Sequence, residues 1–188
     1  MLAEVKRQTI HMLLGSFIIA VLLLMEFKYA ATFIFLFTAL GLTLALLLKE
    51  RKIKSKLLME IIGALQRKNE VIIHGEPAIW FLLGVCITTL LFPDKIVLIV
   101  GLLVLTFGDA FSTIFGSAFG KIKLRENRTL EGSLAGIIAA TLSLFYILGL
   151  PLHQAFIVAA IGMLAEYVPL NDNVTIPVFA CFAFKLLM

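Results

Sequence analysis

The most informative segment of the sequence is GDAFSTIFGSAFGKIKLRENRTLEGSLAG, residues 108–136. Asp109 follows an uncharged apolar run that begins at Ile96, and Glu131 lies at the start of another apolar run. The short loop between the two runs carries four cations: Lys121, Lys123, Arg125 and Arg128. Two carboxylates therefore lie at the mouths of two hydrophobic helices. A charge within a bilayer span is energetically costly, so residues of this kind are candidates for a function.

Composition indicates the class of protein. Of the 188 residues, 61% are hydrophobic and 15% are charged, whereas soluble domains are roughly a quarter charged. The sequence therefore predicts an all-α, polytopic integral membrane protein, with residues 1–188 forming one membrane-embedded domain. The net charge of +4 reflects basic loops between spans, so we expect no nucleic-acid partner. Cys86 and Cys181 lie inside apolar runs, and we expect buried thiols without a disulfide.

Hydropathy predicts seven membrane spans and one helix on the membrane surface. The predicted spans are residues 9–27, 29–48, 78–92, 96–119, 130–150, 152–168 and 174–188. Between the second and third spans, residues 49–77 are rich in Lys and Arg. Apolar residues recur there at helical spacing: Leu57, Leu58, Ile61, Ile62 and Leu65. This pattern predicts an amphipathic helix lying on the bilayer.

The distribution of basic residues predicts the orientation. With the N-terminus in the cytosol, 13 of the 16 Lys and Arg residues are cytosolic, and only Lys28, Lys95 and Lys185 lie outside. The same orientation collects the polar residues at the cytosolic face, which we expect to hold the active site. These residues are Glu4, Arg7, His11, His74, Glu76, Asp109, Glu131, Glu166, Asn171, Asp172 and Asn173.

Small residues recur every fourth position in the predicted fourth span. Gly108, Ser112, Gly116 and Gly120 share one helix face, which is typical of close packing between membrane helices. A face without large side chains also lets a ligand approach the backbone, and we expect a lipid tail to enter between spans along it. Both interpretations can hold together.

The carboxylates allow two interpretations. Asp109 is either one half of a structural ion pair with a loop cation, or a Mg²⁺ ligand or general base. Mg²⁺ prefers one or two carboxylates together with phosphate oxygens and water. Asp109, Glu131, Glu166 and Asp172 can offer such oxygens at a common depth.

The basic loop likewise has an ordinary and a functional interpretation. Lys121, Lys123, Arg125 and Arg128 fit a cytosolic loop, but between two carboxylates they also form a site for a Mg²⁺-bound phosphate. Thr129 is a predicted N-cap, which would direct the backbone N–H groups of Glu131, Gly132 and Ser133 toward the same anion. His11 and His74 are either acid–base groups or hydrogen-bonded structural residues.

The ordered motifs resemble one enzyme superfamily. Gly108-Asp109-Ala110, Gly116, Phe119-Gly120-Lys121 and Thr129-Leu130-Glu131-Gly132-Ser133 resemble the signature of the CTP-dependent polyprenol kinases. These include dolichol, phytol and CTP-dependent diacylglycerol kinases, and they are related to the phosphatidate cytidylyltransferases. Three further segments match: Glu4-x-x-Arg7-x-x-x-His11, His74-Gly75-Glu76 before Trp80, and Glu166-x-x-Pro169 with Asn171-Asp172-Asn173. Gln8 and Arg128 depart from the pattern, since both stand where a Lys is usual.

The resemblance implies transfer of the CTP γ-phosphate to the hydroxyl of a membrane isoprenoid alcohol, with Mg²⁺ as cofactor. On that basis Asp109 and Glu131 are the expected catalytic residues, and Asp109, Glu131 and Asp172 the expected metal ligands. The expected phosphate-binding residues are Lys121, Lys123, Arg125, Arg128, Gly132 and Ser133. Further expected site residues are Arg7, His11, Glu76, Glu166 and Asn173. The alternatives are a cytidylyltransferase-like CDP-lipid synthase, a diacylglycerol kinase and, more remotely, a small ion-coupled transporter.

Overall fold

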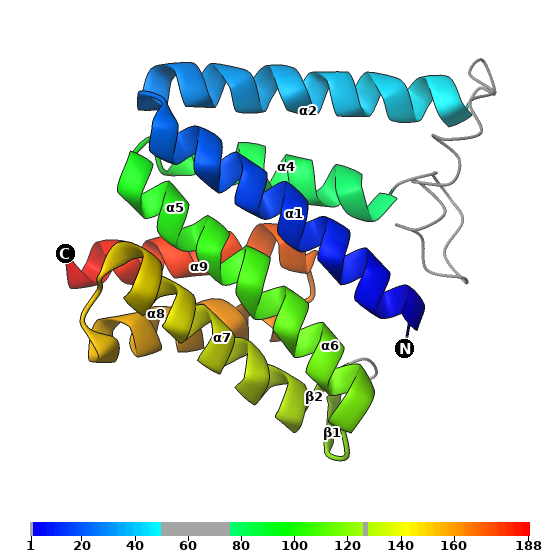
Figure 1. The fold of residues 1–188 in the computed structure, drawn as a ribbon, viewed down its shortest axis with the longest axis vertical. Helices are drawn as coiled ribbons and strands as arrows, with labels where there is room; N and C mark the ends of the chain where they lie inside the picture. The colour runs from blue at the N-terminus through cyan, green and yellow to red at the C-terminus, as the bar shows by residue number, and fades with distance from the viewer. Residues whose placement is uncertain (1, 50–75, 126–127) are drawn as a thin grey trace.

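Helices account for almost all of the structure, a computed structural model that describes residues 2–49, 76–125 and 128–188. The order is α1 (Leu2–Leu24), α2 (Phe27–Lys49), α4 (Glu76–Leu91), α5 (Lys95–Leu103), η1 (Val104–Asp109), α6 (Ala110–Phe119), β1 (Lys123–Arg125), β2 (Arg128–Thr129), α7 (Leu130–Leu148), α8 (Leu152–Leu164), η2 (Ala165–Tyr167) and α9 (Asp172–Leu187) (Figure 1). The predicted all-α class is thus confirmed. The predicted amphipathic helix and His74 lie outside the described residues.

Several of these helices are suited to a membrane. Four are long and apolar enough to cross one: Glu4–Leu24, Phe27–Leu47, Lys95–Phe119 and Leu130–Leu148. Glu76–Leu91 and Leu152–Tyr167 are apolar but shorter. The protein is therefore a helical membrane protein, as the composition predicts.

Local sequence signals account for the helix ends. Asp94 caps α5, because its Oδ1 accepts hydrogen bonds from the N–H groups of Ile96 at 2.9 Å and Val97 at 3.0 Å. At the other end of α7, Gly149 adopts a left-handed conformation with φ of 67°, which a residue without Cβ adopts freely. Pro151 then precedes α8. These turns separate the spans close to the predicted boundaries.

The centre of the bundle is the continuous helix formed by α5, η1 and α6. Its 18-residue apolar window is 78% buried, compared with 22–33% for the other three long helices. Leu98, Leu102 and Leu105 are fully buried within it. Helix α9 crosses this helix at close range, since a Cβ on Gly101 would come within 2.8 Å of the Pro177 carbonyl oxygen. Figure 1 shows α2 at the edge of the bundle, on the far side of α1.

Two features of the central segment differ from the expected regular helix and loop. Residues Val104–Asp109 form a π-helical turn, which accommodates one extra residue in a longer helix. The loop between α6 and α7 contains an antiparallel strand pair, in which Lys123 pairs with Thr129 and Arg125 with Arg128. This hairpin holds the basic residues beside the N-terminus of α7.

Candidate functional site

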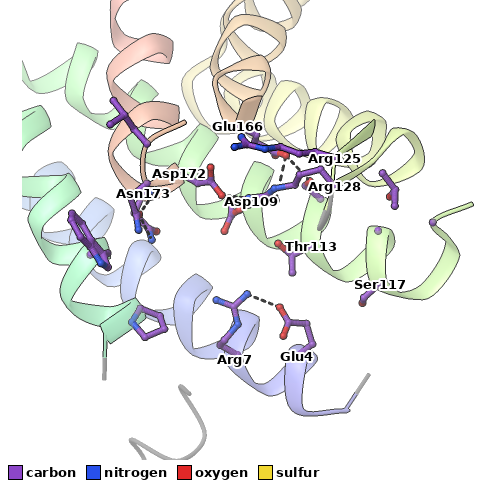
Figure 2. A pocket seen from close by; sticks show the side chains of 18 of the residues that line it. Glu4, Arg7, Asp109, Thr113, Ser117, Arg125, Arg128, Glu166, Asp172 and Asn173 are labelled. Atoms are coloured by element: carbon purple, nitrogen blue, oxygen red, sulfur yellow. Dashed lines mark hydrogen bonds and ion pairs between the residues drawn. The ribbon is translucent and has the colours of Figure 1, made fainter. Parts of the chain in front are cut away.

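A cavity of about 750 Å³ lies where the hairpin meets the helix ends. Its walls come from the first turns of α1 and α4, the end of η1, α6, the hairpin, η2 and the start of α9. Figure 2 shows Thr113 and Ser117 of α6 on one side, and Glu4 and Arg7 of α1 across from them. Volumes of this size accommodate small-molecule ligands and cofactors. Most of the polar residues predicted to share one face do meet here.

Arg128 is the centre of a cluster of three carboxyl groups (Figure 2). Its Nη1 lies 3.6 Å from Asp109 Oδ1 and 3.3 Å from Glu166 Oε2. Its Nη2 donates a hydrogen bond to Asp172 Oδ2. The three carboxyl groups come from η1, η2 and the first residue of α9. Tertiary packing therefore joins one cation to acidic residues that lie far apart in the sequence.

The cluster is largely shielded from solvent. The Arg128 side chain is 16% exposed and the Glu166 side chain is 0% exposed. Burial alone lowers the pKa of Arg128, but the charges of Asp109, Glu166 and Asp172 outweigh burial, and the pKa rises above its usual value. Arg128 therefore stays charged at any physiological pH. One guanidinium therefore forms ion pairs with three carboxyl groups.

Glu166 retains unused hydrogen-bonding capacity. Its Oε2 accepts a hydrogen bond from Ser112 Oγ at 3.4 Å and also faces Arg128. Its Oε1 is buried and has no hydrogen-bond partner among residues 2–49, 76–125 and 128–188. A buried carboxyl oxygen without a partner is unfavourable. A further donor or a cation in the cavity would satisfy this atom.

The π-helical turn positions Asp109. It ends at Asp109, so the regular helix that follows starts at the cavity wall. The turn packs against α1, where His11 Nε2 lies 3.4 Å from the Leu105 carbonyl oxygen. His11 also makes an edge-to-face contact with Phe81, with 4.7 Å between ring centroids. His11 does not line the cavity, so its place in the structure favours a packing role.

The small-residue stripe packs against α7. A Cβ on Gly132 would lie 2.7 Å from the Ser112 carbonyl oxygen and 3.0 Å from Gly116 Cα. A Cβ on Gly136 would lie 2.8 Å from the Gly108 carbonyl oxygen. The predicted close packing is thus confirmed. Ser112, Gly116 and Gly120 of the same face also line the cavity, and the expected passage of a lipid tail along this face stays a prediction.

The N-terminus of α7 is capped by its own chain. Thr129 Oγ1 accepts a hydrogen bond from the Gly132 N–H at 3.2 Å, which confirms the predicted N-cap. Ser133 Oγ shares a hydrogen bond of 2.9 Å with the Tyr167 hydroxyl. Neither Gly132 nor Ser133 lines the cavity. The Gly132 N–H and the Ser133 hydroxyl are thus engaged within the protein.

Glu131 lies apart from the carboxyl cluster. Its carboxylate accepts hydrogen bonds from the backbone N–H groups of Lys121 at 3.0 Å and Ile122 at 3.3 Å. It lines a separate hollow together with Phe119, Gly120 and Lys121. Glu131 therefore closes the base of the hairpin in this structure, and Lys121 also lies outside the main cavity.

The remaining predicted residues lie around the cavity. Arg7 donates a 2.5 Å hydrogen bond to Glu4, and both line the wall on α1. Glu76 and Asn173 line it as well, as do Lys123 and Arg125. Arg125 donates to the Tyr167 carbonyl oxygen at 3.4 Å, which fixes the hairpin against η2.

Gln8, one of the departures from the family pattern, is fully buried. Neither its amide nitrogen nor its amide oxygen has a hydrogen-bond partner within the described part of the chain.

Two polar cavity residues, Thr113 and Ser117, were not singled out from the sequence, and Trp80 was named there only as a landmark of the resemblance. Thr113 and Ser117 follow Asp109 at intervals of four residues, so they continue its helix face beside the glycine stripe. That spacing was a usable signal. Trp80 lies one turn after Glu76 and its indole Nε1 donates to Glu76 Oε1 at 3.4 Å, but no spacing rule distinguishes it from the other apolar residues of α4.

The donor set suits Mg²⁺. Asp109, Glu166 and Asp172 supply carboxyl oxygens to one cavity, and Mg²⁺ takes one or two carboxylates plus phosphate oxygens and water. In this structure the Arg128 guanidinium lies among these oxygens. Within the described ranges, no three His, Cys, Asp or Glu residues are arranged to hold a metal by themselves. The residues therefore fit a cation that is bound together with a phosphate ligand.

Fold and site together define a helical membrane protein with a charged cavity at one end of its bundle. The chain is 30% identical to the uncharacterized protein MJ1137 of the archaeon Methanocaldococcus jannaschii, over 95% of this chain and 91% of the relative. The chain belongs to the same family as that protein. No protein-family model matches the chain, and no solved structure matches it.

Proposed function

We propose that the protein is a CTP-dependent lipid kinase that phosphorylates a membrane isoprenoid alcohol of the polyprenol, dolichol or phytol kind. The observation that carries the proposal is the cluster of Asp109, Glu166 and Asp172 around Arg128, in a cavity that also holds Lys123 and Arg125. Phosphoryl transfer requires positioning and charge neutralisation more than a covalent nucleophile. Cations and oxygen ligands in one cavity can position the phosphate groups and neutralise their charge. The CTP preference rests on the sequence resemblance.

The topology proposed with this function has seven spans and a cytosolic N-terminus. In this topology the short helices α4, α8 and α9 also cross the membrane, which brings the four long spans to seven. The basic hairpin then faces the cytosol, where nucleotide is available. The lipid alcohol stays in the bilayer and presents its hydroxyl at the cavity.

In the proposed reaction, the lipid hydroxyl oxygen bonds to the γ-phosphorus while the bond from that phosphorus to the β–γ bridging oxygen breaks. CDP leaves, and the hydroxyl proton passes to a carboxylate. Asp109 is the best-placed candidate for the general base or a metal ligand. It lies on the cavity wall at the membrane end of α6, where the lipid hydroxyl would enter. Asp172 and Glu166 would hold Mg²⁺, which would neutralise phosphate charge. Lys123, Arg125 and Arg128 bind the phosphates.

The test uses purified protein in detergent with Mg²⁺, a polyprenol and CTP labelled in either the α- or the γ-phosphate. We expect the γ-label to appear in the lipid. Asp109→Asn should lower kcat by about 100-fold or more, because the carboxylate that accepts the proton or faces the metal is lost. Asp94→Asn is the matched control: it lies in the same continuous helix, and Asn also caps helices well.

Other outcomes distinguish the alternatives. Transfer of the α-label to phosphatidate would identify a cytidylyltransferase, and phosphorylation of diacylglycerol alone would identify a diacylglycerol kinase. Normal turnover by Asp109→Asn would refute the assigned role of this residue. Failure of every nucleoside triphosphate and lipid alcohol to react would refute the kinase proposal and leave an ion-coupled transporter to be tested.

A further inference from the structure

The arrangement around Arg128 is unusual for a structural ion pair. Its Nη1 lies within 3.6 Å of two carboxyl groups, and its Nη2 donates to a third. A single buried guanidinium balances one carboxylate, whereas this one faces Asp109, Glu166 and Asp172. Among the described residues, Arg128 is the one cation within ion-pair distance of these three groups, so the cluster can accept further positive charge.

A second, independent observation points to a cation-binding site. Glu166 Oε1 is buried in the cavity wall, and its side chain is 0% exposed. No donor within the described ranges reaches this atom. A metal ion or another donor bound in the cavity would give this oxygen a partner.

We propose that Arg128 is an internal substitute for the divalent cation: it occupies the carboxyl cluster in the empty enzyme and moves to the nucleotide phosphates when the metal binds. This inference rests on the proposed function for the identity of the second ligand. Arg128 is then a positioning residue that couples the two binding events. Arg128 moves between two sets of anions, whereas the carboxyl groups stay in place to hold Mg²⁺ or to accept the proton.

The chemistry of the two ligands makes this exchange favourable. The planar Arg fork binds carboxylates and phosphates alike, often through two parallel hydrogen bonds. A divalent ion brings more charge to Asp109, Glu166 and Asp172 than the guanidinium that leaves. Without a phosphate, however, the displaced Arg128 loses its partners. Metal and nucleotide therefore bind cooperatively, and each must raise the affinity for the other by the same factor.

The test measures Mn²⁺ binding to detergent-solubilised protein without nucleotide or lipid, from the electron paramagnetic resonance signal of free Mn²⁺. Arg128→Met removes the competing charge and keeps an unbranched side chain. We expect its affinity for Mn²⁺ to be about tenfold higher than that of the natural protein. A general loss of positive charge in the cavity would also raise Mn²⁺ affinity, so a second variant must separate this effect from direct competition by Arg128.

Arg125→Met is the matched control. Arg125 lines the same cavity and carries the same charge, but it donates to the Tyr167 carbonyl oxygen and has no close contact with the three carboxyl groups among those observed. The charge of Arg125 also acts on Asp172, but at longer range than that of Arg128, so we expect its loss to raise Mn²⁺ affinity by less than about twofold.

Arg128→Lys keeps the proposal testable if the Met variant does not fold. A single ammonium cannot bridge three carboxyl groups as the Arg fork does, so we expect Mn²⁺ affinity between those of the natural protein and Arg128→Met. Unchanged or weaker Mn²⁺ binding in the Met variant, or in the Lys variant if only that one folds, would overturn the proposal. An equal gain in Arg125→Met would also overturn it.

The two proposals fail separately. If the natural protein phosphorylates a lipid alcohol but Arg128→Met gains no Mn²⁺ affinity, the kinase assignment stands and the exchange does not. If no lipid is phosphorylated but Mn²⁺ affinity rises as expected, Arg128 still competes with a metal, and the reaction must be sought elsewhere.

Discussion

Two carboxylates at the mouths of neighbouring helices, Asp109 and Glu131, have very different surroundings. Asp109 faces Arg128 at 3.6 Å on the wall of the main cavity. Glu131 instead accepts hydrogen bonds from two backbone N–H groups of the hairpin. A carboxylate with its lone pairs engaged by the backbone is a poor candidate for a metal ligand. Among single residues, Glu166 and Asp172 are therefore better candidates for metal ligands than Glu131.

This shift predicts how isosteric amides affect metal binding. Asp172→Asn should weaken Mn²⁺ binding by about tenfold, in the range seen when groups around metal sites are altered. Glu131→Gln should change it by less than about twofold, because Gln keeps an oxygen acceptor for the Lys121 and Ile122 N–H groups. The same Mn²⁺ titration measures both. Equal losses in the two variants would place Glu131 in the metal site after all.

At the scale of elements, the packing of α6 on α7 fixes the hairpin that carries Arg128. Gly116 and Gly132 allow the two helices to touch, because a Cβ on Gly132 would lie only 3.0 Å from Gly116 Cα. Thr129 then caps α7 directly after Arg128. The position of the guanidinium thus depends on glycines that lie outside the carboxyl cluster.

Gly132→Val should therefore destabilise the protein and misplace the hairpin. Overpacking of this kind costs about 1–3 kcal/mol, and thermal unfolding in detergent measures the loss. Ala118→Val on the exposed face of α6 is the control, since it adds a β-branched side chain where nothing is crowded. Equal stability of the two variants would show that α6 and α7 can separate without cost.

At the scale of the whole molecule, the cavity lies at one end of the bundle and the α7–α8 turn at the other. Helix α7 has 19 residues between them, a length of about 28 Å. The end with the cavity carries the basic hairpin, while the α7–α8 turn (149–151) and the first turn of α8, which includes His153, carry no Lys or Arg. This asymmetry favours a cytosolic cavity.

Membrane sidedness can be tested with single cysteines after Cys86 and Cys181 are replaced by Ala. Lys123→Cys and His153→Cys place thiols at exposed positions near the two ends. An impermeant maleimide should label Lys123→Cys only in inside-out vesicles and His153→Cys only in right-side-out vesicles. Labelling of both from one side would refute the proposed topology.

Helix ends and the grouping of polar residues were predictable, because their signals are local. Asp94, Thr129 and Gly149 mark helix ends by capping and turn chemistry. Counting spans then placed Asp109, Glu166 and Asp172 at one face. Their convergence on Arg128 was not predictable, because it depends on how helices far apart in the sequence pack. Likewise, residues 104–109 are almost all apolar. The spacing of their side chains therefore does not indicate whether the turn is π-helical or α-helical.

The π-helical turn has a consequence for the evolution of the chain. One residue in an α-helix contributes about 100° of rotation and about 1.5 Å of length. The wider π-helical turn takes up one extra residue, so deleting one residue within Val104–Asp109 would let a regular helix form with α5 and α6 still nearly in phase. A deletion in the regular turns of α5 or α6 has no such compensation, and it would rotate the buried face of α5 by about 100° relative to the cavity face of α6. We therefore expect homologues that lack the π-helical turn to be one residue shorter at this position, and α5 and α6 otherwise to keep their lengths.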